Sequence, residues 1–341
     1  SGLAITSKKE EWMALAGDNQ DLAFALDLLY DEFAQAPVLG SLIDPMRRFG
    51  EGTLIPVTWD QIAPMLEKAL TTKKDEERDG IGVVAHGLAR AAGMLAGRYH
   101  LIATNVPYLV RLKQNEEIKD FCTNYYPLSK NDIATVFLEK SLEFCKEGGT
   151  TSVVIPQNWL FLSTYSKLRV KLLNNYVWNI ITRLGPKGFQ TPMWDFNVQL
   201  LIISKFHKKT HIIEGLDVSQ FNNPMEKERG LITGKITKFS QRSQIDNLDA
   251  RISFDNIQGV LLEKYANSYV GLQTGDSNRF IRKFWEISKK DPIWELYQFT
   301  SYENLKFSGL SGLIMWDSGK GVLSSFEGAR VQGIDALNKY G

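Results

Sequence analysis

Short apolar runs alternate with amphipathic segments between residues 99 and 204, and this alternation is the strongest constraint on the fold. Helical spacing of apolar residues begins at a cap, Asn131 or Asp132, after the first run, and returns from Thr164 after the second. Strand, helix, strand, helix, strand within about 105 residues predicts an α/β fold with a largely parallel sheet. No helical pattern separates the last two runs, so we expect them to pair antiparallel at one edge of the sheet. The four runs are Tyr99–Thr104, Thr151–Pro156, Trp178–Leu184 and Val198–Ser204.

The chain on either side of this region has a different character. Residues 1–97 read as helical, with apolar residues at three- and four-residue spacing. Beyond residue 208, Gly, Asn, Ser and charged residues mix without clear periodicity. We therefore expect three parts, residues 1–97, 98–208 and 209–341. In detail we expect helices at 10–16, 20–33, 59–69 and 87–96, a loop at 40–56, a solvated loop or helix end in the charge run at 71–79, and an ordered element at 271–276.

Composition excludes several classes of protein. The chain has 40 Lys and Arg against 39 Asp and Glu, so its net charge of +1 argues neither for nor against a nucleic-acid partner. Two cysteines rule out a disulfide scaffold, and with four scattered histidines we expect no metal site. The longest apolar run, Leu200–Ile203, is far too short to cross a membrane, and no signal peptide is recognisable. We expect a cytoplasmic protein without a membrane partner.

A tetrapeptide suited to chemistry, Asn105-Val106-Pro107-Tyr108, follows the first apolar run. In an open parallel sheet, ligands bind beyond the carboxyl ends of the strands. Asn105 and the next backbone carbonyl can accept hydrogen bonds from an amino group, and the ring of Tyr108 can stack on a base and stabilise a cation. These are the requirements of methyl transfer to an exocyclic amine. The tetrapeptide is also typical of a plain strand-terminating turn.

The surroundings of this tetrapeptide resemble the gamma-class adenine-N6 DNA methyltransferases of restriction–modification systems, including fused restriction–methylation enzymes and phage-exclusion methylases. Their signature is Asn/Asp-Pro-Pro-Tyr/Phe at the end of the fourth strand, and residues 105–108 match it with Val106 in place of the first proline. The resemblance continues in the same order through 131–173, 182–204 and, more loosely, GLQTGDSNRF at 271–280. It implies the C-terminal half of a class I, Rossmann-like methyltransferase sheet, preceded by a helical insertion and followed by the start of a DNA-recognition region.

The same resemblance implies a role for each residue of the site. Asn105 would accept a hydrogen bond from the N6 amine of the target adenine, and Val106 would offer its backbone carbonyl. Pro107 would shape the loop, and Tyr108 would stack on the flipped base. Phe189 aligns with the aromatic residue that covers the other face of the base. Since valine also has a backbone carbonyl, the change at position 106 is compatible with the reaction, although the loop loses one rigid proline.

Double-stranded DNA is the partner that the resemblance implies, and the target base must then leave the duplex to be reached. A local run of positive charge fits a phosphate-lined cleft, because Gly148–Trp194 contains no Asp or Glu. Its basic residues are Lys167, Arg169, Lys171, Arg183 and Lys187. For the first three, the solvated face of an amphipathic helix is the competing interpretation. As DNA-binding residues we expect Arg111, Lys113, Arg183 and Lys187.

S-adenosylmethionine is the cofactor that the resemblance implies for the full-length parent protein. The family binds it through an Asp/Asn-Pro-x-x-Gly-x-Gly loop after the first strand, and no such motif is recognisable in this chain. Asp79-Gly80-Ile81-Gly82 follows a charge run rather than a strand, so we interpret it as a loop. The chain starts at Ser1 without a methionine, and we expect the cofactor motif upstream of it, with room for further domains in the parent. The isolated chain is then expected to bind S-adenosylmethionine weakly or not at all.

Two other functions are compatible with the sequence. A protein-glutamine or RNA methyltransferase also uses an Asn-Pro-Pro-Tyr loop, which holds a planar amide or amine. A non-catalytic DNA-binding module could keep the sheet and lack cofactor binding. Gly271–Phe280 fits either a DNA contact or a simple turn, and we expect Trp194-Asp195-Phe196 to pack beneath the edge of the sheet.

Overall fold

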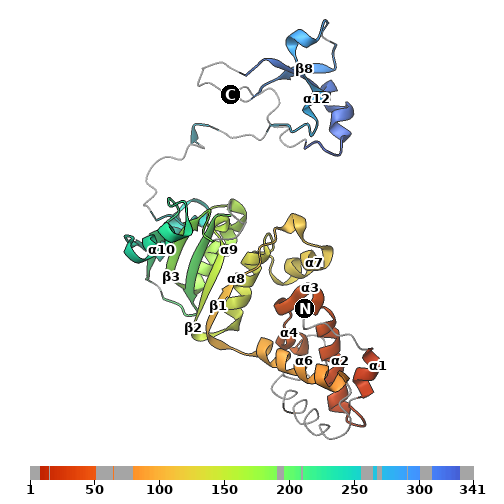
Figure 1. Ribbon diagram of the computed structural model, residues 1–341, viewed down its shortest axis with the longest axis vertical. Helices are drawn as coiled ribbons and strands as arrows, with labels where there is room; N and C mark the ends of the chain where they lie inside the picture. Colours follow the sequence, from red (N-terminus) through yellow and green to blue (C-terminus); the bar gives the residue numbers. More distant parts are fainter. Residues whose placement is uncertain are drawn as a thin grey trace. The chain divides into compact units, whose positions relative to one another are not determined.

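The computed structural model describes most of the chain and divides it into two compact units, Ser1–Ile257 and Gln258–Gly341, both drawn in Figure 1. The described residues are 8–14, 16–50, 64, 80–189, 196–208, 210–254, 264–266, 271–289, 291–299 and 309–330. Apart from Pro64, the helix expected at 59–69 and the charge run at 71–79 lie outside them.

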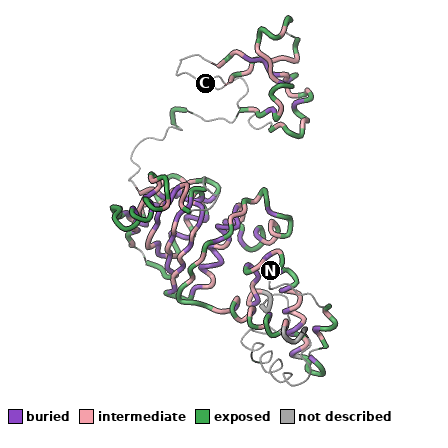
Figure 2. The backbone as a smooth tube through the Cα atoms, viewed as in Figure 1, coloured by how far each residue is buried: buried purple, intermediate pink, exposed green. Residues whose placement is uncertain are grey.

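The first unit begins with helices that share an apolar core. Trp12, Leu26 and Ala92 are buried where α1, α2 and α6 meet, and exposed residues lie on the outer sides of these helices (Figure 2). Asn19 caps α2 by accepting a hydrogen bond from the amide of Leu22 at 3.0 Å. The helices are α1 Lys9–Ala14, α2 Gln20–Ala34, α3 Ala36–Leu39, α4 Pro45–Gly50 and α6 Gly80–Ala96. The helices expected at 10–16 and 20–33 are thus confirmed.

Helix α4 lies where the sequence predicted a loop, and that prediction was wrong. Asp44 caps the helix, because its Oδ1 accepts hydrogen bonds from the amides of Met46 and Arg47 at 3.1 and 3.3 Å. Pro45 stands at the first helical position, where its missing amide is not needed. Helix α6 likewise starts at Gly80 rather than at the expected Gly87, so the Gly-rich segment at its start is helical.

A six-stranded sheet follows and confirms the α/β class (Figure 1). Its strands are β1 Tyr99–Asn105, β2 Cys145–Pro156, β3 Val177–Gly185, β4 Val198–Ser204, β5 Ile212–Asp217 and β6 Thr237–Ser240. Their order is β1-β2-β4-β3-β5-β6. The pairings give β1, β2, β3 and β5 one direction and give β4 and β6 the opposite one, so the sheet is mostly parallel in direction, as expected.

The expected antiparallel pair of β3 and β4 is confirmed, but its expected place at the sheet edge was wrong. β4 lies between β2 and β3, so Leu200 pairs with Val154 on one side and with Thr182 on the other. Leu201 and Ile203 point to the same face of the sheet and are fully buried, as expected for a central strand whose one face packs on the core. On its far side β3 pairs with β5, and β5 with β6. The sheet therefore continues past residue 208, where the sequence predicted the end of the α/β part.

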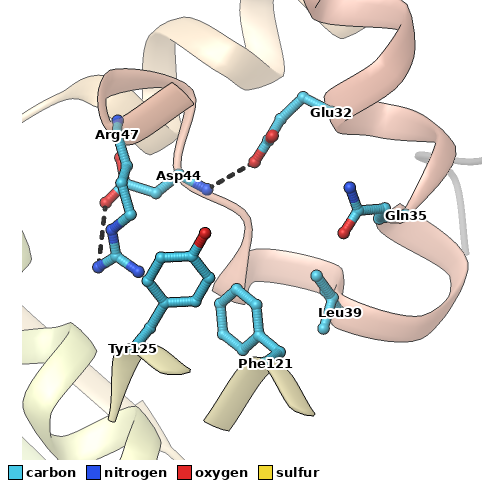
Figure 3. A pocket seen from close by; sticks show the side chains of 7 residues that line it. All are labelled: Glu32, Gln35, Leu39, Asp44, Arg47, Phe121 and Tyr125. Atoms are coloured by element: carbon cyan, nitrogen blue, oxygen red, sulfur yellow. Dashed lines mark hydrogen bonds and ion pairs between the residues drawn. The ribbon is translucent and has the colours of Figure 1, made fainter. Parts of the chain in front are cut away.

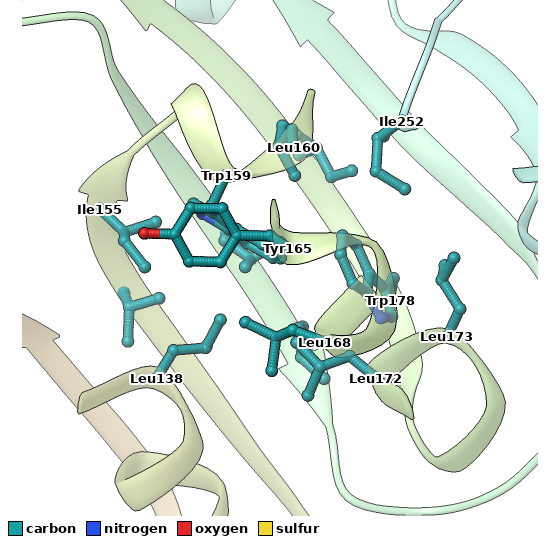
Figure 4. Close-up of a cluster of buried hydrophobic side chains, with 14 of the residues drawn as sticks. Leu138, Ile155, Trp159, Leu160, Tyr165, Leu168, Leu172, Leu173, Trp178 and Ile252 are labelled. Carbon is teal, nitrogen blue, oxygen red and sulfur yellow. The ribbon is translucent and has the colours of Figure 1, made fainter. Parts of the chain in front are cut away.

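Helices α8 and α9 pack on this sheet and form the main core. Leu138 of α8 and Leu168 of α9 meet Ile155 of β2 and Trp178 of β3, as Figure 4 shows. The helices that follow β1 are α7 Glu116–Tyr125, α8 Ile133–Phe144, α9 Ser166–Asn175, α10 Pro224–Thr233 and α11 Gln241–Asp246. The sequence analysis did not predict α7, α10 or α11.

Charged side chains join the N-terminal helices to α7 and α8. Lys140 of α8 is buried, and its Nζ donates a hydrogen bond to Oδ2 of Asp44 at 2.7 Å. Arg47 donates to the hydroxyl of Tyr126 at 3.3 Å, and its guanidinium lies 4.5 Å from the ring centroid of Tyr125. Figure 3 shows Arg47 beside Tyr125 at a cavity of about 280 Å³. The cavity is lined by Glu32, Gln35, Leu39, Asp44, Arg47, Phe121 and Tyr125.

The second unit contains a small antiparallel sheet in the order β7-β9-β8. Its elements are α12 Ser277–Phe280, β7 Ile281–Lys283, β8 Trp294–Tyr297 and β9 Gly312–Met315. The ordered element expected at 271–276 is a turn in which Gln273 pairs with Arg330. Gly275 has a φ of +69°, and a Cβ there would lie 2.3 Å from the carbonyl oxygen of Gly328, so this turn requires glycine. Within the described parts of both units, no helix combines the length and the apolar character that a membrane crossing needs.

Candidate active site at the end of strand β1

The tetrapeptide at 105–108 leaves the sheet at the carboxyl end of β1. Asn105 is the last residue of β1 and pairs with Val154 of β2. Val106 is buried, and its amide donates a hydrogen bond to the carbonyl of Val154 at 3.4 Å. A proline at position 106 could not donate this bond. Val106, which departs from the family signature, thus ties the loop to β2 by a hydrogen bond that a proline could not form. This bond offsets the loss of rigidity expected from the sequence.

Asp132 holds the exit of this loop against helix α8. Its Oδ1 accepts hydrogen bonds from the amide of Leu109 at 3.2 Å and from the amide of Ala134 at 2.9 Å. Leu109 in turn accepts a bond from the amide of Ile133 at 3.1 Å. Burial raises the pKa of Asp132, and the two amide hydrogen bonds oppose that rise. Of the two predicted caps, Asp132 is the one that forms, and its second role in fixing the candidate catalytic loop could not be predicted from cap spacing.

Tyr108 connects the loop to the sheet. Its hydroxyl donates a hydrogen bond to Oδ1 of Asn105 at 3.2 Å. Its ring packs against the buried cluster of Leu184, Val198 and Val218. Burial raises the pKa of Tyr108, and the nearby carboxylate of Asp132 raises it further, so the phenol is neutral at physiological pH. The acceptor oxygen and the aromatic ring that base binding requires are therefore close together.

Phe196 is the aromatic residue that the structure stacks on Tyr108. The ring centroids are 6.0 Å apart and the planes are inclined by 29°. Phe196 is 48% exposed, so the expectation that it packs beneath the sheet edge was wrong. Phe189, expected to cover the second face of the base, lies in the same β3–β4 loop and is also exposed. Its stacking role stays a prediction, and Trp194 and Asp195 lie outside the described residues.

The four expected DNA-binding residues differ in what surrounds them. Arg111 and Lys113 lie in a short 3-10 turn just after the loop; Arg111 donates to the hydroxyl of Thr123 at 3.1 Å, whereas Lys113 is exposed. Arg183 forms an ion pair with Asp217 at 3.6 Å and lies between two aromatic rings. Lys187 has a φ of +57° in the β3–β4 loop. Of the four, Lys113 alone is exposed, and contact with a phosphate stays a prediction for all of them.

The basic residues of helix α9 are neither one phosphate-binding surface nor one solvated face. Arg169 is completely buried, and its guanidinium donates to backbone carbonyls at 2.5 to 3.0 Å. Lys171 pairs with Glu139 at 2.5 Å. Lys167 and Lys171 are exposed, so only Arg169 lacks the exposure that both interpretations assumed for all three. The carbonyls that accept from Arg169 belong to Trp159, Leu162, Asp249 and Ala250.

Residues 53–189 match the model of a protein family described as Eco57I restriction-modification methylase. The resemblance to restriction–modification methylases is thereby confirmed. The candidate catalytic loop, Asn105–Tyr108, lies inside the matched residues.

Two curated relatives are named as adenine-specific methyltransferases. BrxX of Escherichia coli O9:H4 (strain HS) is 26% identical over 217 residues, which cover 58% of this chain and 17% of BrxX. PglX of Lacticaseibacillus casei (strain Zhang) is 28% identical over 165 residues, which cover 44% of this chain and 14% of PglX. The chain thus spans less than a fifth of either relative. Among solved structures, the ATP-dependent Type ISP restriction-modification enzyme LlaBIII bound to DNA is 15% identical with a TM-score of 0.39, and the match covers 76% of this chain and 22% of that enzyme.

Proposed function

We propose that this chain supplies the base-holding half of a site-specific DNA methyltransferase that modifies adenine N6 in a restriction–modification or phage-exclusion system. One observation carries the proposal. The acceptor oxygen of Asn105 and the ring of Tyr108 lie together at the end of a sheet strand, within the residues that match the methylase family. A strand-terminating turn does not by itself require this pairing of an amide acceptor with an aromatic face.

The geometry suits an exocyclic amine whose lone pair is delocalised into a ring. The Oδ1 of Asn105 has two lone pairs, and the Tyr108 hydroxyl uses one of them, which leaves one for a proton of the amine. The carbonyl of Val106 can accept the second proton. Two acceptors hold the nitrogen in the orientation that exposes its lone pair, and the ring of Tyr108 stabilises the positive charge that develops on methylation.

Duplex DNA is the substrate that we propose, with the target adenine turned out of the helix. Turning a base out costs a few kcal/mol, which contacts to the phosphate backbone can offset. Lys113 follows Tyr108 by five residues, Lys187 lies two residues before Phe189, and these two lysines are the candidates for those contacts. Arg111 and Arg183 would contribute after giving up their present partners.

The described residues do not by themselves fit S-adenosylmethionine, the methyl donor that this family implies. We find no Gly-rich turn between a strand and a helix among them, since Gly80 and Gly82 lie inside α6. Within the described residues β1 pairs on one side only, and Leu101 in β1 is 63% exposed. We propose that the strand carrying the cofactor loop adds to this open edge of β1, and we assign no catalytic step to the cofactor here.

Transfer of a labelled methyl group tests the proposed function. Full-length protein is incubated with labelled S-adenosylmethionine and duplex DNA, and the nucleosides are separated after digestion. We expect label on N6-methyladenine, and we expect Asn105→Ala to abolish it because the amine loses its acceptor. Asn174→Ala, which changes an exposed asparagine on α9, should retain the activity. Label on protein glutamine or on RNA, or duplex binding without any label, would contradict the proposal and favour one of the two alternative functions.

A further inference from the structure

A buried lysine lies close to the candidate site, on a helix outside the segment that matches the methylase family. Lys227 of α10 is only 2% exposed. Its ammonium donates hydrogen bonds to the carbonyl of Leu184 at 2.5 Å and to the carbonyl of Val218 at 3.2 Å. Among the described residues no carboxylate forms an ion pair with it. Burial lowers the pKa of Lys227; Asp217 opposes this effect and Lys187 adds to it. A buried ammonium is tolerated only where hydrogen bonds replace those it makes to water. The two carbonyls supply these bonds and so fix the position of the ammonium.

The two carbonyls belong to the residues against which Tyr108 packs. Leu184 and Val218, together with Val198, form the buried cluster that contacts the ring of Tyr108. Leu184 lies at the end of β3, and Val218 follows β5. The ammonium thus links the C-terminal ends of β3 and β5 at the place where both contact the ring of Tyr108.

Helix α10 can hold the ammonium there because it lies very close to the chain after β5. A Cβ on Gly230 would lie 2.6 Å from the ring of Phe221 and 3.0 Å from the side chain of Val218. Asn223 caps the helix through the amide of Glu226 at 2.9 Å. The sequence shows no clear helical periodicity here, whereas the structure forms α10 and packs it against the chain after β5.

We propose that Lys227 is a positioning residue that holds the packing surface of Tyr108 in place, and so keeps the Tyr108 ring oriented for base stacking. The consequence for methyl transfer rests on the proposed function. The contact itself does not, because it is a property of this chain alone. Without the ammonium, the carbonyls of Leu184 and Val218 would turn toward other donors and the cluster would shift.

Two readouts test the role of Lys227. The first is ¹⁹F NMR of the 341-residue chain with 3-fluorotyrosine at position 108, compared between wild type, Lys227→Met and Lys227→Arg. The second is methyl transfer by the full-length protein, with kcat and KM for DNA measured separately. Lys235→Met, an exposed lysine just beyond α10, is the matched control.

We expect Lys227→Met to move the ¹⁹F resonance and to lower kcat by about 10- to 100-fold with little change in KM, since small displacements of positioning groups have effects of this size. Lys227→Arg should bring the ¹⁹F resonance and kcat part of the way back to wild type, because it restores a buried donor. Lys235→Met should change neither the resonance nor kcat. Thermal unfolding identifies any variant that fails to fold, in which case Lys227→Arg carries the comparison. A resonance that stays in place in folded Lys227→Met would overturn the proposal. A shifted resonance in Lys227→Met, together with a wild-type full-length protein that does not methylate DNA, would uphold the contact and refute the proposed function instead.

Discussion

At the residue scale, the hydroxyl and the ring of Tyr108 make different contacts. The hydroxyl forms one hydrogen bond, to Asn105, while the ring packs against the sheet and faces Phe196. We expect Tyr108→Phe to stay within about tenfold of wild-type methyl transfer, since a single neutral hydrogen bond contributes roughly 1 kcal/mol. Tyr108→Ala should lower activity further, because base stacking on an aromatic side chain contributes about 1–3 kcal/mol. Steady-state kinetics of the full-length protein would show the difference.

Phe24→Ala removes an exposed aromatic side chain of helix α2 and serves as the control for this comparison. An equal loss of activity in Tyr108→Phe and Tyr108→Ala would mean that the hydroxyl, and not the ring, is the functional group.

Arg169 acts at the scale of elements, because it joins helix α9 to two distant segments. It binds the turn that follows β2, at Trp159 and Leu162, and the turn at Asp249 and Ala250. Burial lowers the pKa of Arg169 to about 10, so the guanidinium keeps its charge at neutral pH. We expect Arg169→Met to lower the free energy of unfolding by about 3 kcal/mol or more, because several buried carbonyls lose their donor. Urea denaturation of the 341-residue chain measures this change.

Lys167→Met removes the exposed lysine two residues earlier and should change stability by less than about 0.5 kcal/mol. If both variants unfold at the same urea concentration, the network around Arg169 is not a structural clamp.

The link between Asp44 and Lys140 acts at the scale of the whole first unit, since it joins the N-terminal helices to the α/β part. Burial alone would raise the pKa of Asp44, but the charge and hydrogen bond of Lys140, together with Arg47, lower it overall. A lowered pKa in the folded state stabilises the protein above the unfolded pKa of 3.8, and this contribution is lost as pH falls through the lowered folded value. Asp44→Asn should be less stable than wild type by about 3 kcal/mol at neutral pH, because the buried Lys140 loses its nearer carboxylate and keeps only Glu143, at 3.5 Å.

Unfolding free energies measured between neutral and strongly acidic pH check this prediction. The difference between wild type and Asp44→Asn should narrow once the pH is low enough to protonate Asp44 in the folded protein. Asp18→Asn, at an exposed carboxylate, should follow wild type at every pH. A difference that does not depend on pH would show that the pair does not stabilise the unit through charge.

Local patterns were enough to predict the elements that local interactions form. The alternation of apolar runs predicted β1 to β4, and cap chemistry predicted that α8 starts at Asn131 or Asp132, because strand burial and helix capping depend on residues close in sequence. The same reasoning placed Asn105–Tyr108 at the end of a strand. It missed α4, whose start depends on an Asp-Pro pair rather than on apolar spacing.

The sequence by itself therefore determined the α/β class, the position of the candidate tetrapeptide at the end of a strand, and its resemblance to methylases. Tertiary structure alone decided that β4 lies between β2 and β3, that Phe196 stacks on Tyr108, and that Arg169 and Lys227 are buried. Each of these depends on residues brought together from distant parts of the chain. The spacing of apolar residues along the sequence does not indicate which distant segment will bury a charged side chain. A buried arginine and an exposed lysine look alike in one sequence, because their difference lies in the backbone carbonyls that folding places around one of them.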